Sequence, residues 1–327
     1  MKFLKGVLVG ACWAACSVSA EPAVSESFLE SAGPTGPLKG TLLAPGSKPV
    51  AVVLIVPGSG PTDRDGNSPA GIKASTYRLL SEGLASRGVT TLRIDKRGMF
   101  ASAAATPDAN AVTIADYVED VRSWVSVLRK ATHTPCVWLL GHSEGGLVAM
   151  VAARDQAGVC GLILVAAAGR PMGEVLREQL KANPANGPLL GPAMSAIDAL
   201  EQGRRVDTET MHPALQGLFE PAVQGFLISA FSYDPRRFVA GISMPVLVLQ
   251  GQRDIQVGEA DARLIQQAEP RAKLVLLPNV NHVLKSVTSH DLRANLATYA
   301  DPGLPLASGV VDAIAAFLND DLNRTKN

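Results

Sequence analysis

A serine with the surroundings of a nucleophile lies at the centre of the segment Gly-His-Ser-Glu-Gly, residues 141–145. This segment follows a short apolar run, residues 136–140, and precedes a helix-compatible run, residues 147–154. A serine on a sharp strand-to-helix turn has strained backbone angles, needs small neighbours, and projects its hydroxyl above the edge of a sheet. The pattern predicts Ser143 as a nucleophile, and a glycine-rich turn without chemistry is the alternative.

Three histidines follow Ser143 in the chain, and one of them is placed as a catalytic base would be. A serine hydroxyl is a poor nucleophile at neutral pH, so it needs a base to accept its proton and a carboxylate to orient that base. His282 lies in a loop directly after the apolar run 273–277, whereas His212 lies in a helical insertion and His290 begins a polar helical segment. We expect His282 to be the general base, and an exposed loop histidine is the alternative.

Asp254 is the candidate for the orienting acid. It comes shortly after the apolar run 246–250 and before the helix-compatible run 259–268, so it would stand at the carboxyl end of a strand. It also precedes the histidine, which is the chain order expected when the serine comes first. A helix N-cap or a surface turn is the alternative use of this aspartate. Asp261 and Asp301 are weaker candidates because neither follows a strand.

Backbone N–H groups near the nucleophile are candidates for stabilising the oxyanion of a tetrahedral intermediate. Such donors usually come from the residue after the nucleophile and from the loop after an earlier strand. Glu144 is the residue after the serine, and the loop 57–61 follows the apolar run 51–56. In that loop we favour Ser59, with Gly60 as the alternative, because glycine on both sides lets the backbone approach a substrate. A turn without a catalytic role is the other interpretation.

Two charged segments carry no predicted catalytic chemistry. Residues 63–67, Asp-Arg-Asp-Gly-Asn, superficially resemble a calcium-binding loop, but the glycine comes too early and no glutamate stands at the twelfth position. We interpret this segment as a polar turn. Residues 95–98, Asp-Lys-Arg-Gly, are expected to turn the chain after a strand, with Arg97 paired to a nearby carboxylate. The sequence predicts neither a metal site nor a cofactor.

Short apolar runs that alternate with amphipathic stretches mark the elements that would position these residues. Continuous runs rich in Val, Ile and Leu are typical of strands buried on both faces, as in parallel sheets. Residues 77–86 and 114–129 have the apolar spacing of helices, and residues 25–29 and 38–43 are expected to form an antiparallel hairpin at the sheet edge. The alternation predicts an α/β fold with a mostly parallel central sheet flanked by helices. The strand-like runs are 51–56, 89–94, 136–140, 161–166, 246–250 and 273–277.

One long gap, residues 169–241, interrupts the alternation. It contains no strand-like run but several helix-compatible pieces separated by prolines. A structureless loop of this length is uncommon inside a compact domain. We therefore predict a helical cap inserted between two parts of one core, residues 21–168 and residues 242–327.

The first twenty residues have the layout of a signal peptide. Two lysines precede an apolar run over residues 6–15, and small residues follow it. This predicts cleavage after Ala20 and a periplasmic or secreted protein with no stable membrane anchor. A membrane anchor is the alternative, but the run is shorter than the roughly 20 residues that cross a bilayer. A lipoprotein modified at Cys12 or Cys16 is a further alternative, although neither cysteine follows a leucine-led lipobox.

Charge and cysteine content narrow the classes of partner. The 30 basic residues equal the 30 acidic ones, and removal of the first twenty residues leaves 28 basic against 30 acidic. The chain offers no basic field for nucleic acid, so we expect no nucleic-acid partner. The serine, histidine and aspartate described above predict a small-molecule ester or acyl substrate instead. Cys136 and Cys160 remain after cleavage and begin neighbouring strand-like runs, which permits either one disulfide or two buried thiols. Nothing in the sequence indicates an oligomeric state.

The segments that contain the candidate serine, aspartate, histidine and oxyanion loop resemble the α/β-hydrolase superfamily, and within it the bacterial serine aminopeptidase-like and carboxylesterase-like branch. The resemblance extends over nearly all of the chain after the first twenty residues. It implies that Ser143, Asp254 and His282 correspond to the catalytic triad of that family. Pro57 is a departure, because many members have histidine before the glycine of the oxyanion loop. The segments that carry the resemblance are 57–66, 95–98, 141–145, 251–254, 281–285, 295–299 and 304–306.

The resemblance does not choose a substrate, because the family contains esterases, lipases, peptidases, thioesterases and acyltransferases. We expect cleavage of carboxylic esters of small to medium size through an acyl-enzyme intermediate, since ester cleavage demands least of leaving-group protonation. An aminopeptidase or amidase with the same triad is one alternative, and a catalytically silent member that acts as a binding module is another. The arginines of the insertion are expected to form a solvated face rather than a site for a charged terminus. They are Arg170, Arg204, Arg205, Arg236 and Arg237.

Overall fold

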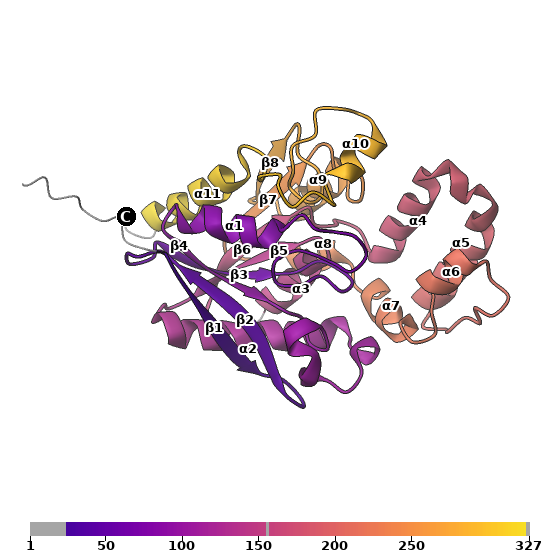
Figure 1. The fold of residues 1–327 in the computed structure, drawn as a ribbon, viewed down its shortest axis with the longest axis horizontal. Helices are drawn as coiled ribbons and strands as arrows, with labels where there is room; N and C mark the ends of the chain where they lie inside the picture. The colour runs from indigo at the N-terminus through magenta and orange to yellow at the C-terminus, as the bar shows by residue number, and fades with distance from the viewer. Residues whose placement is uncertain (1–23, 155–156, 325–327) are drawn as a thin grey trace, which may run out of the picture.

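The structure, a computed structural model, describes residues 24–154 and 157–324 (Figure 1). The predicted signal peptide, residues 1–20, lies outside the described residues. An eight-stranded sheet forms the centre of the molecule, with the strand order β1-β2-β4-β3-β5-β6-β7-β8. Strands β3 to β8 are parallel to one another, whereas β2 pairs antiparallel with both β1 and β4. The strands are β1 Ser25–Ala32, β2 Pro37–Ala44, β3 Ala51–Val56, β4 Val89–Ile94, β5 Val137–His142, β6 Val159–Val165, β7 Val246–Gly251 and β8 Lys273–Leu277.

Helices cover both faces of the sheet, as the α/β pattern predicts. Helices α1 and α11 lie on one face, and α2, α3 and α9 lie on the other (Figure 1). The helices are α1 Thr76–Ala85, α2 Ile114–Thr132, α3 Glu144–Ala153, α4 Met172–Ala182, α5 Leu190–Glu201, α6 Pro213–Leu218, α7 Gln224–Phe231, α8 Pro235–Val239, α9 Glu259–Ala268, α10 Leu292–Ala297 and α11 Val310–Arg324. The described residues also form three short 3₁₀ helices, η1 Phe100–Ala105, η2 Ala109–Ala111 and η3 Pro184–Leu189.

The strand β3 shows why a continuous apolar run forms a central strand. Its six residues are all buried, and alternate side chains point to opposite faces of the sheet. Leu54 packs into the cluster that contains α2 and α3, whereas Val53 and Ile55 pack into the cluster that contains α1 and α11. A strand with both faces covered requires an apolar residue at every position rather than at every second one.

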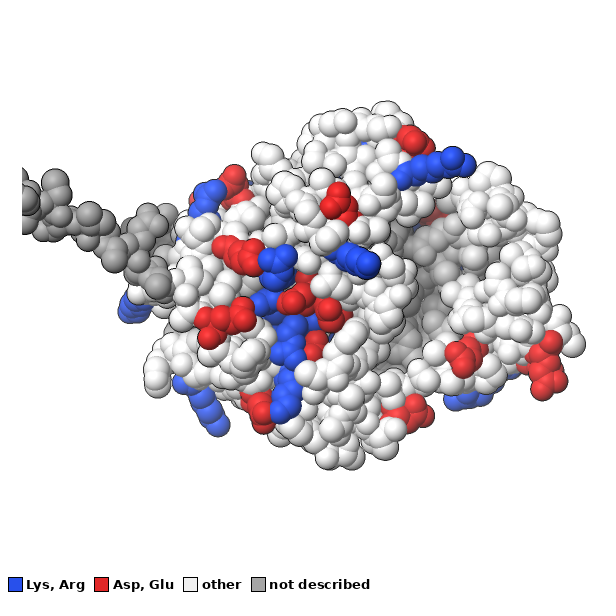
Figure 2. All heavy atoms as spheres, viewed as in Figure 1, with Lys and Arg blue, Asp and Glu red and all other residues white. Residues whose placement is uncertain are grey.

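The chain between β6 and β7 folds into helices α4 to α8, and the described residues between these strands include no strand. Figure 1 shows α4 to α7 as a lobe beside the core, and Figure 2 shows the surface hollowed between this lobe and the core. Side chains of the lobe such as Ile197 and Leu215 belong to the same buried cluster as the core helices. The predicted division into a cap, residues 169–241, and two core segments stays a prediction.

Two predicted boundaries differ from the structure next to the candidate nucleophile. Strand β5 continues to His142, because the ladder with β6 extends to the 2.9 Å hydrogen bond from the Ser143 N–H to the Val165 carbonyl. Helix α3 begins at Glu144 rather than at residue 147. The turn between strand and helix is therefore a single residue, Ser143.

The two cysteines of the described chain are joined to each other. Cys136 stands directly before β5 and Cys160 lies in the neighbouring strand β6, with 5.2 Å between their α-carbons and a bond between their sulfurs. The described residues contain no helix with the length and apolar character needed to span a bilayer.

Candidate active site

Ser143 occupies a strained turn between β5 and α3. Its φ is 54° and its ψ is −122°, a combination that non-glycine residues rarely adopt and that tightly packed surroundings must hold in place. A β-carbon at position 141 would lie 2.2 Å from the Gly145 carbonyl oxygen, and one at position 145 would lie 2.2 Å from the Val56 carbonyl oxygen. The two glycines of the segment are required because the turn packs directly on its own backbone and on β3.

Asp254 and His282 are in direct contact, although they are 28 positions apart in the chain. Oδ2 of Asp254 lies 2.8 Å from Nδ1 of His282, and the two side chains are 1% and 6% exposed. The other carboxylate oxygen accepts the backbone N–H groups of Gln256 and Val257 at 2.8 and 3.0 Å. The carboxylate is thus fixed in orientation and in turn orients the imidazole.

Ser143 and His282 line one cavity of about 70 Å³, together with Ser59 and Gln256. Nδ1 of His282 is engaged by Asp254, which leaves Nε2 as the ring atom available to a serine. Among the described residues, the Ser143 hydroxyl makes no hydrogen bond to His282 or to another group. Hydrogen bonds of this kind are often long in unliganded sites and tighten when substrate binds.

A second histidine, His142, joins the nucleophile turn to the loop of His282. Its Nε2 lies 2.9 Å from the His282 carbonyl oxygen, and its Nδ1 lies 2.9 Å from the hydroxyl of Tyr77. Burial, with a smaller contribution from His282, lowers the pKa of His142 to about 3, so the ring is neutral. Since a carbonyl only accepts, Nε2 carries the hydrogen and Nδ1 accepts the Tyr77 hydroxyl. That hydroxyl accepts the N–H of Gly58 at 2.9 Å.

The polar segment 63–67 places Tyr77 for this role. The Asp63 carboxylate accepts the N–H groups of Asp65 and Asn67 at 2.9 and 2.8 Å, which closes the turn. The Asp65 carbonyl then accepts the N–H of Tyr77 at 3.0 Å and so starts α1. The segment is a polar turn that fixes the first turn of this helix. The residues that the structure describes include no cluster of His, Cys, Asp and Glu suited to a metal ion.

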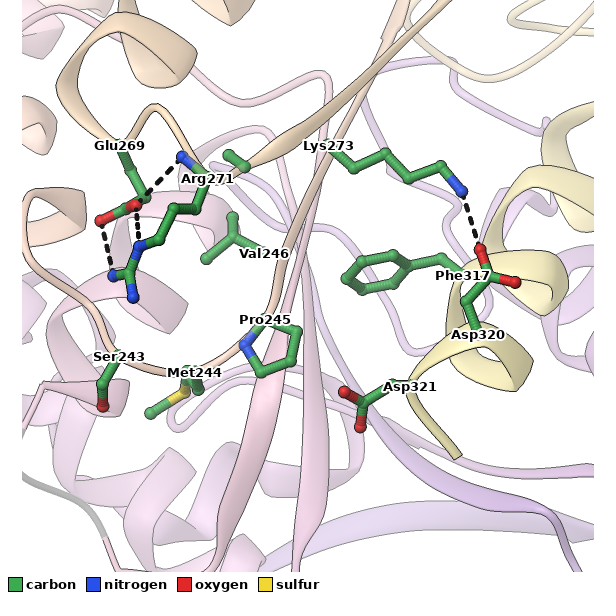
Figure 3. Close-up of a pocket in the computed structure, with 11 residues that line it drawn as sticks. Ser243, Met244, Pro245, Val246, Glu269, Arg271, Lys273, Phe317, Asp320 and Asp321 are labelled. Carbon is green, nitrogen blue, oxygen red and sulfur yellow. Dashed lines mark hydrogen bonds and ion pairs between the residues drawn. The ribbon is translucent and has the colours of Figure 1, made fainter. Parts of the chain in front are cut away.

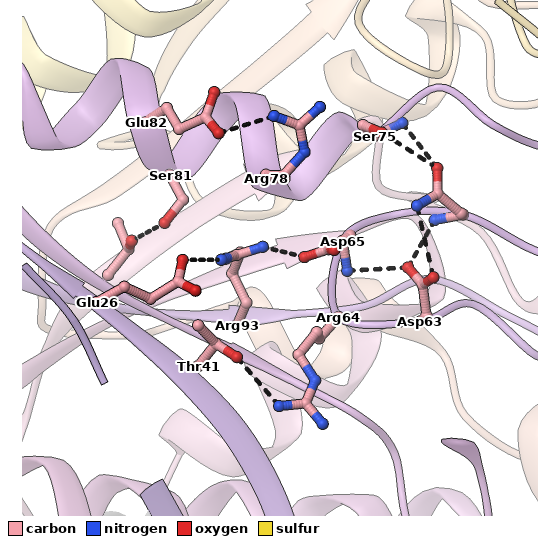
Figure 4. A network of polar contacts seen from close by, with 12 residues as sticks. Glu26, Thr41, Asp63, Arg64, Asp65, Ser75, Arg78, Ser81, Glu82 and Arg93 are labelled. Atoms are coloured by element: carbon pink, nitrogen blue, oxygen red, sulfur yellow. Dashed lines mark hydrogen bonds and ion pairs between the residues drawn. The ribbon is translucent and has the colours of Figure 1, made fainter. Parts of the chain in front are cut away.

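Charged residues surround this turn in alternating sign. Arg93 lies between Glu26 and Asp65 (Figure 4). Arg64 binds Asp95 with 2.6 Å between the guanidinium and the carboxylate. Figure 2 shows acidic and basic side chains interleaved on the corresponding face, over β1, β2 and the start of α1. These charges are paired with one another, so they form a structural network rather than a field of one sign.

Two residues in the loop between β3 and α1 are predicted to supply an N–H group to the oxyanion, and one of them reaches the cavity. Ser59 lines the cavity, whereas Gly60 is not among the residues that line it. A β-carbon at Gly58 would lie 3.3 Å from the β-carbon of Ser143, so the loop backbone passes directly beside the nucleophile. Glu144 is the first residue of α3, where backbone N–H groups point away from the helix and carry its partial positive charge.

The segment 95–98 contains a site residue that the sequence analysis missed. The expected pairing of Arg97 is confirmed, because its guanidinium binds Asp120 at 2.6 Å. Lys96, for which we predicted no role, donates to the Gly58 carbonyl at 2.7 Å and lies 3.6 Å from the carboxylate of Glu144. The available signal was a cation placed two positions after a fully buried strand.

The other candidates from the sequence have different partners. Asp261, a weaker candidate for the acid, binds Arg170 at 2.7 Å. The expectation of a solvated arginine face is therefore wrong for Arg170, whose side chain is 19% exposed and ties the start of the lobe to α9. His212 caps α6 by accepting the N–H of Ala214 at 3.2 Å. His290 lies 2.7 Å from the guanidinium of Arg253.

A hollow of about 390 Å³, larger than the cavity at Ser143, lies at the amino ends of strands β7 and β8 (Figure 3). It is lined by the residues at the start of β7 and β8, whereas ligands of open α/β sheets bind at the carboxyl ends of the strands. Its charges are also paired, because Arg271 binds Glu269 at 2.8 Å and Lys273 binds Asp320 at 3.1 Å. We therefore place the candidate active site at Ser143 and not in this hollow.

The sheet order, with a serine turn after β5, an aspartate after β7 and a histidine after β8, defines the α/β-hydrolase fold. Solved structures agree. The α/β hydrolase GrgF from Penicillium sp. sh18 superimposes with a TM-score of 0.57 and 20% identity, over 92% of this chain and 98% of that one. Est1E from Butyrivibrio proteoclasticus gives a TM-score of 0.54 and 18% identity, over 90% and 99%. The resemblance and fold predicted from the motifs are confirmed.

Sequence comparison points to the same branch of hydrolases. The chain is 28% identical over 268 residues to Esterase EstD of Thermotoga maritima, a match that covers 80% of this chain and 61% of that protein. The chain thus spans less than two thirds of the length of this curated relative. The model of the family described as serine aminopeptidase, S33, matches residues 70–212. That stretch contains Ser143 but neither Asp254 nor His282.

Proposed function

We propose that the chain is a serine hydrolase that cleaves carboxylic esters of small to medium size through an acyl-enzyme intermediate. The observation that carries this proposal is the buried 2.8 Å contact between Asp254 and His282 beside the cavity that Ser143 lines. A carboxylate, an imidazole and a strained serine at one edge of a sheet form the arrangement needed to activate a hydroxyl. The name of the relative from Thermotoga maritima supports an ester as the substrate.

Acylation begins when Nε2 of His282 takes the proton of the Ser143 hydroxyl. The serine Oγ attacks the carbonyl carbon of the ester, and the carbonyl oxygen becomes an oxyanion that accepts the N–H groups of Glu144 and Ser59. Asp254 stabilises the imidazolium that forms. The intermediate collapses as the bond to the alcohol oxygen breaks, and the imidazolium gives its proton to that oxygen. The products are an alcohol and an acyl group on Ser143.

Deacylation repeats the sequence with water as the nucleophile. His282 takes a proton from water, and the resulting hydroxide forms a bond to the acyl carbon. The bond from that carbon to the serine Oγ then breaks, and the imidazolium returns a proton to the serine. A carboxylic acid leaves and the free enzyme is restored, with no cofactor or metal used in either half of the reaction.

An aminopeptidase or amidase activity is the second candidate, because the matched family is described as serine aminopeptidase. It uses the same triad but has to protonate a poorer leaving group. Purified protein assayed on p-nitrophenyl acetate and butyrate and on aminoacyl anilides separates the two. We expect kcat/KM to be larger for the esters, and turnover dominated by the anilides would replace the ester proposal with this one.

Ser143→Ala tests whether the site is catalytic at all. We expect it to lower kcat by several orders of magnitude, roughly 10⁴-fold or more, as removal of a triad nucleophile does. A fluorophosphonate probe should label the wild-type protein and not the variant. Ester turnover and labelling that are both absent from the wild type would instead support a catalytically silent binding module.

We further propose that the protein is periplasmic or secreted and starts at Glu21 after cleavage. The bond between Cys136 and Cys160 supports this, because disulfides persist in oxidising compartments and are rare in the cytosol. Amino-terminal sequencing of the protein from a fractionated bacterial host is the test. A mature chain that keeps residues 1–20 and stays with the cytosol would contradict the proposal.

A further inference from the structure

Lys96 is a buried cation whose hydrogen-bond and ion-pair partners, Gly58 and Glu144, lie beside the nucleophile. It follows β4, its side chain is 5% exposed, and its ammonium lies 5.1 Å from the centre of the Tyr117 ring. The same ammonium donates to the Gly58 carbonyl at 2.7 Å. Burying an ammonium is costly unless it is paired and hydrogen-bonded, so a lysine at this place calls for an explanation.

The contact with Gly58 fixes the direction of a particular N–H group. The Gly58 carbonyl and the Ser59 N–H belong to one peptide unit, and the described chain contains no cis peptide bond. In a trans peptide the C=O and N–H bonds point in opposite directions. When Lys96 holds the Gly58 oxygen on the buried side, the Ser59 N–H points to the other side, where Ser59 and Ser143 line the cavity.

Gly58 is also held through its own N–H. That group donates to the Tyr77 hydroxyl at 2.9 Å, so the peptide units on both sides of the Gly58 α-carbon are tied to buried side chains. Glycine is the residue type with the greatest rotational freedom, and an untied Gly58 would let the Ser59 N–H turn away. Lys96 and Tyr77 together remove that freedom.

Glu144 supplies the counter-charge to Lys96. Its carboxylate is 1% exposed, lies 3.6 Å from the ammonium, and has no hydrogen-bond partner within the described part of the chain. Burial lowers the pKa of Lys96 and raises the pKa of Glu144, while their mutual attraction opposes both shifts. Glu144 is also the residue whose N–H is the second oxyanion donor. The pair therefore links the two segments that supply donors.

We propose that Lys96 is a positioning residue of the oxyanion hole, which holds the Gly58–Ser59 peptide so that the Ser59 N–H faces the oxyanion, with Glu144 as its buried counter-charge. The proposal rests on the serine hydrolase function and adds a residue to its machinery. A cation on the Gly58 oxygen also polarises the peptide and makes its N–H a stronger donor. Lys96 does not touch the substrate and acts only through the peptide.

The test is Lys96→Met, which keeps the length of the apolar stem and removes the ammonium. We expect kcat for p-nitrophenyl butyrate to fall by roughly 10- to 100-fold, less than the loss of about 10²–10³-fold for deleting a donor outright. We expect KM to change little, because the donor acts on the charge of the transition state rather than on the bound ester. The inhibition constant of a trifluoromethyl ketone, which forms an oxyanion on Ser143, should rise by the same factor as kcat falls.

A double variant keeps the proposal testable if the single variant does not fold. Lys96→Met leaves Glu144 buried without a counter-charge, whereas Lys96→Met with Glu144→Gln removes both charges at once. The double variant should recover stability but not kcat. Lys96→Arg, which retains a cation and a donor, should recover part of kcat.

Arg97→Met is the matched control, because it removes the neighbouring buried cation, which binds Asp120 and does not contact Gly58. It should lower stability and leave kcat unchanged. A folded Lys96→Met or double variant with wild-type kcat, or a rise in KM alone, overturns the proposal. A wild type without Ser143-dependent turnover or labelling overturns the hydrolase function as well, so the two failures are distinguishable.

Discussion

The hydroxyl of Tyr77 donates to Nδ1 of His142 at 2.9 Å, and the opposite ring nitrogen of His142 donates to the His282 carbonyl. One neutral imidazole thus joins α1, the nucleophile turn and the loop of the candidate base. Protonation would place a hydrogen on Nδ1 and turn it from an acceptor into a donor. The Tyr77 hydroxyl accepts the Gly58 N–H and gives its own hydrogen to Nδ1, so a charged His142 would leave that hydrogen without its acceptor and break this chain of hydrogen bonds.

His142 should therefore make the stability of the protein depend on pH. Its pKa of about 3 lies below the ordinary value of 6.5, so between these values the unfolded chain binds a proton that the folded protein excludes. This contribution to the free energy of unfolding is complete above about pH 6.5 and is lost as the pH falls, by up to about 1.4 kcal/mol per unit. Urea unfolding of the wild type and His142→Gln from about pH 4 to about pH 7 checks this. The variant should show the flatter profile, and equal slopes would contradict the assignment.

Asp254→Asn should abolish most activity while the fold is kept. An amide at this position no longer selects the His282 tautomer that leaves Nε2 free to accept a proton, and we expect kcat to fall by roughly 10³–10⁴-fold. Asp261→Asn is the control, because that carboxylate is fully buried but binds Arg170 instead of a histidine. It should alter the midpoint temperature of thermal unfolding and leave kcat within about twofold of the wild-type value. Equal kcat losses in the two variants would remove Asp254 from the triad.

The sequence predicts the parts of this site that depend on local pattern and chain order. Ser143 is marked by its flanking glycines, and Asp254 and His282 by their positions just after apolar runs. A parallel sheet brings such positions to one edge, so the order of the strands did not have to be known in advance.

The contacts of Lys96, Tyr77 and Arg170 were not predictable in the same way. Each depends on which distant segment lies opposite the side chain; Lys96, for example, meets Gly58, which is 38 positions away in the chain. Apolar periodicity specifies which face of an element is buried but not which polar atoms meet there. The start of α3 at Glu144 was missed for a related reason, since the glycines that the turn requires hide the beginning of the helical pattern.

Gly145→Ala should unfold or inactivate the protein through a local clash. The added β-carbon would lie 2.2 Å from the Val56 carbonyl oxygen and 2.6 Å from that of Pro57, and neither backbone atom moves easily. We expect a loss of at least about 1–3 kcal/mol in the free energy of unfolding, together with loss of ester turnover. Gly217→Ala in α6 is the control, because a β-carbon there meets no atom within 4 Å. It should leave stability unchanged or raise it by up to about 1 kcal/mol, and similar effects of both changes would argue against the tight turn.

The disulfide between Cys136 and Cys160 should contribute measurably to stability. The bond closes a segment in which the two cysteines are 24 positions apart, and a loop of this length restricts the unfolded chain by about 3.5 kcal/mol. Replacing both cysteines with alanine should lower the free energy of unfolding by about that amount, and dithiothreitol should destabilise the wild type but not the variant. Kcat should be unchanged in both cases, because the bond lies before β5 and in β6, away from the carboxyl ends where Ser143 stands. Two titratable thiols in the untreated mature protein, or equal stability with and without reductant, would show that the bond does not form.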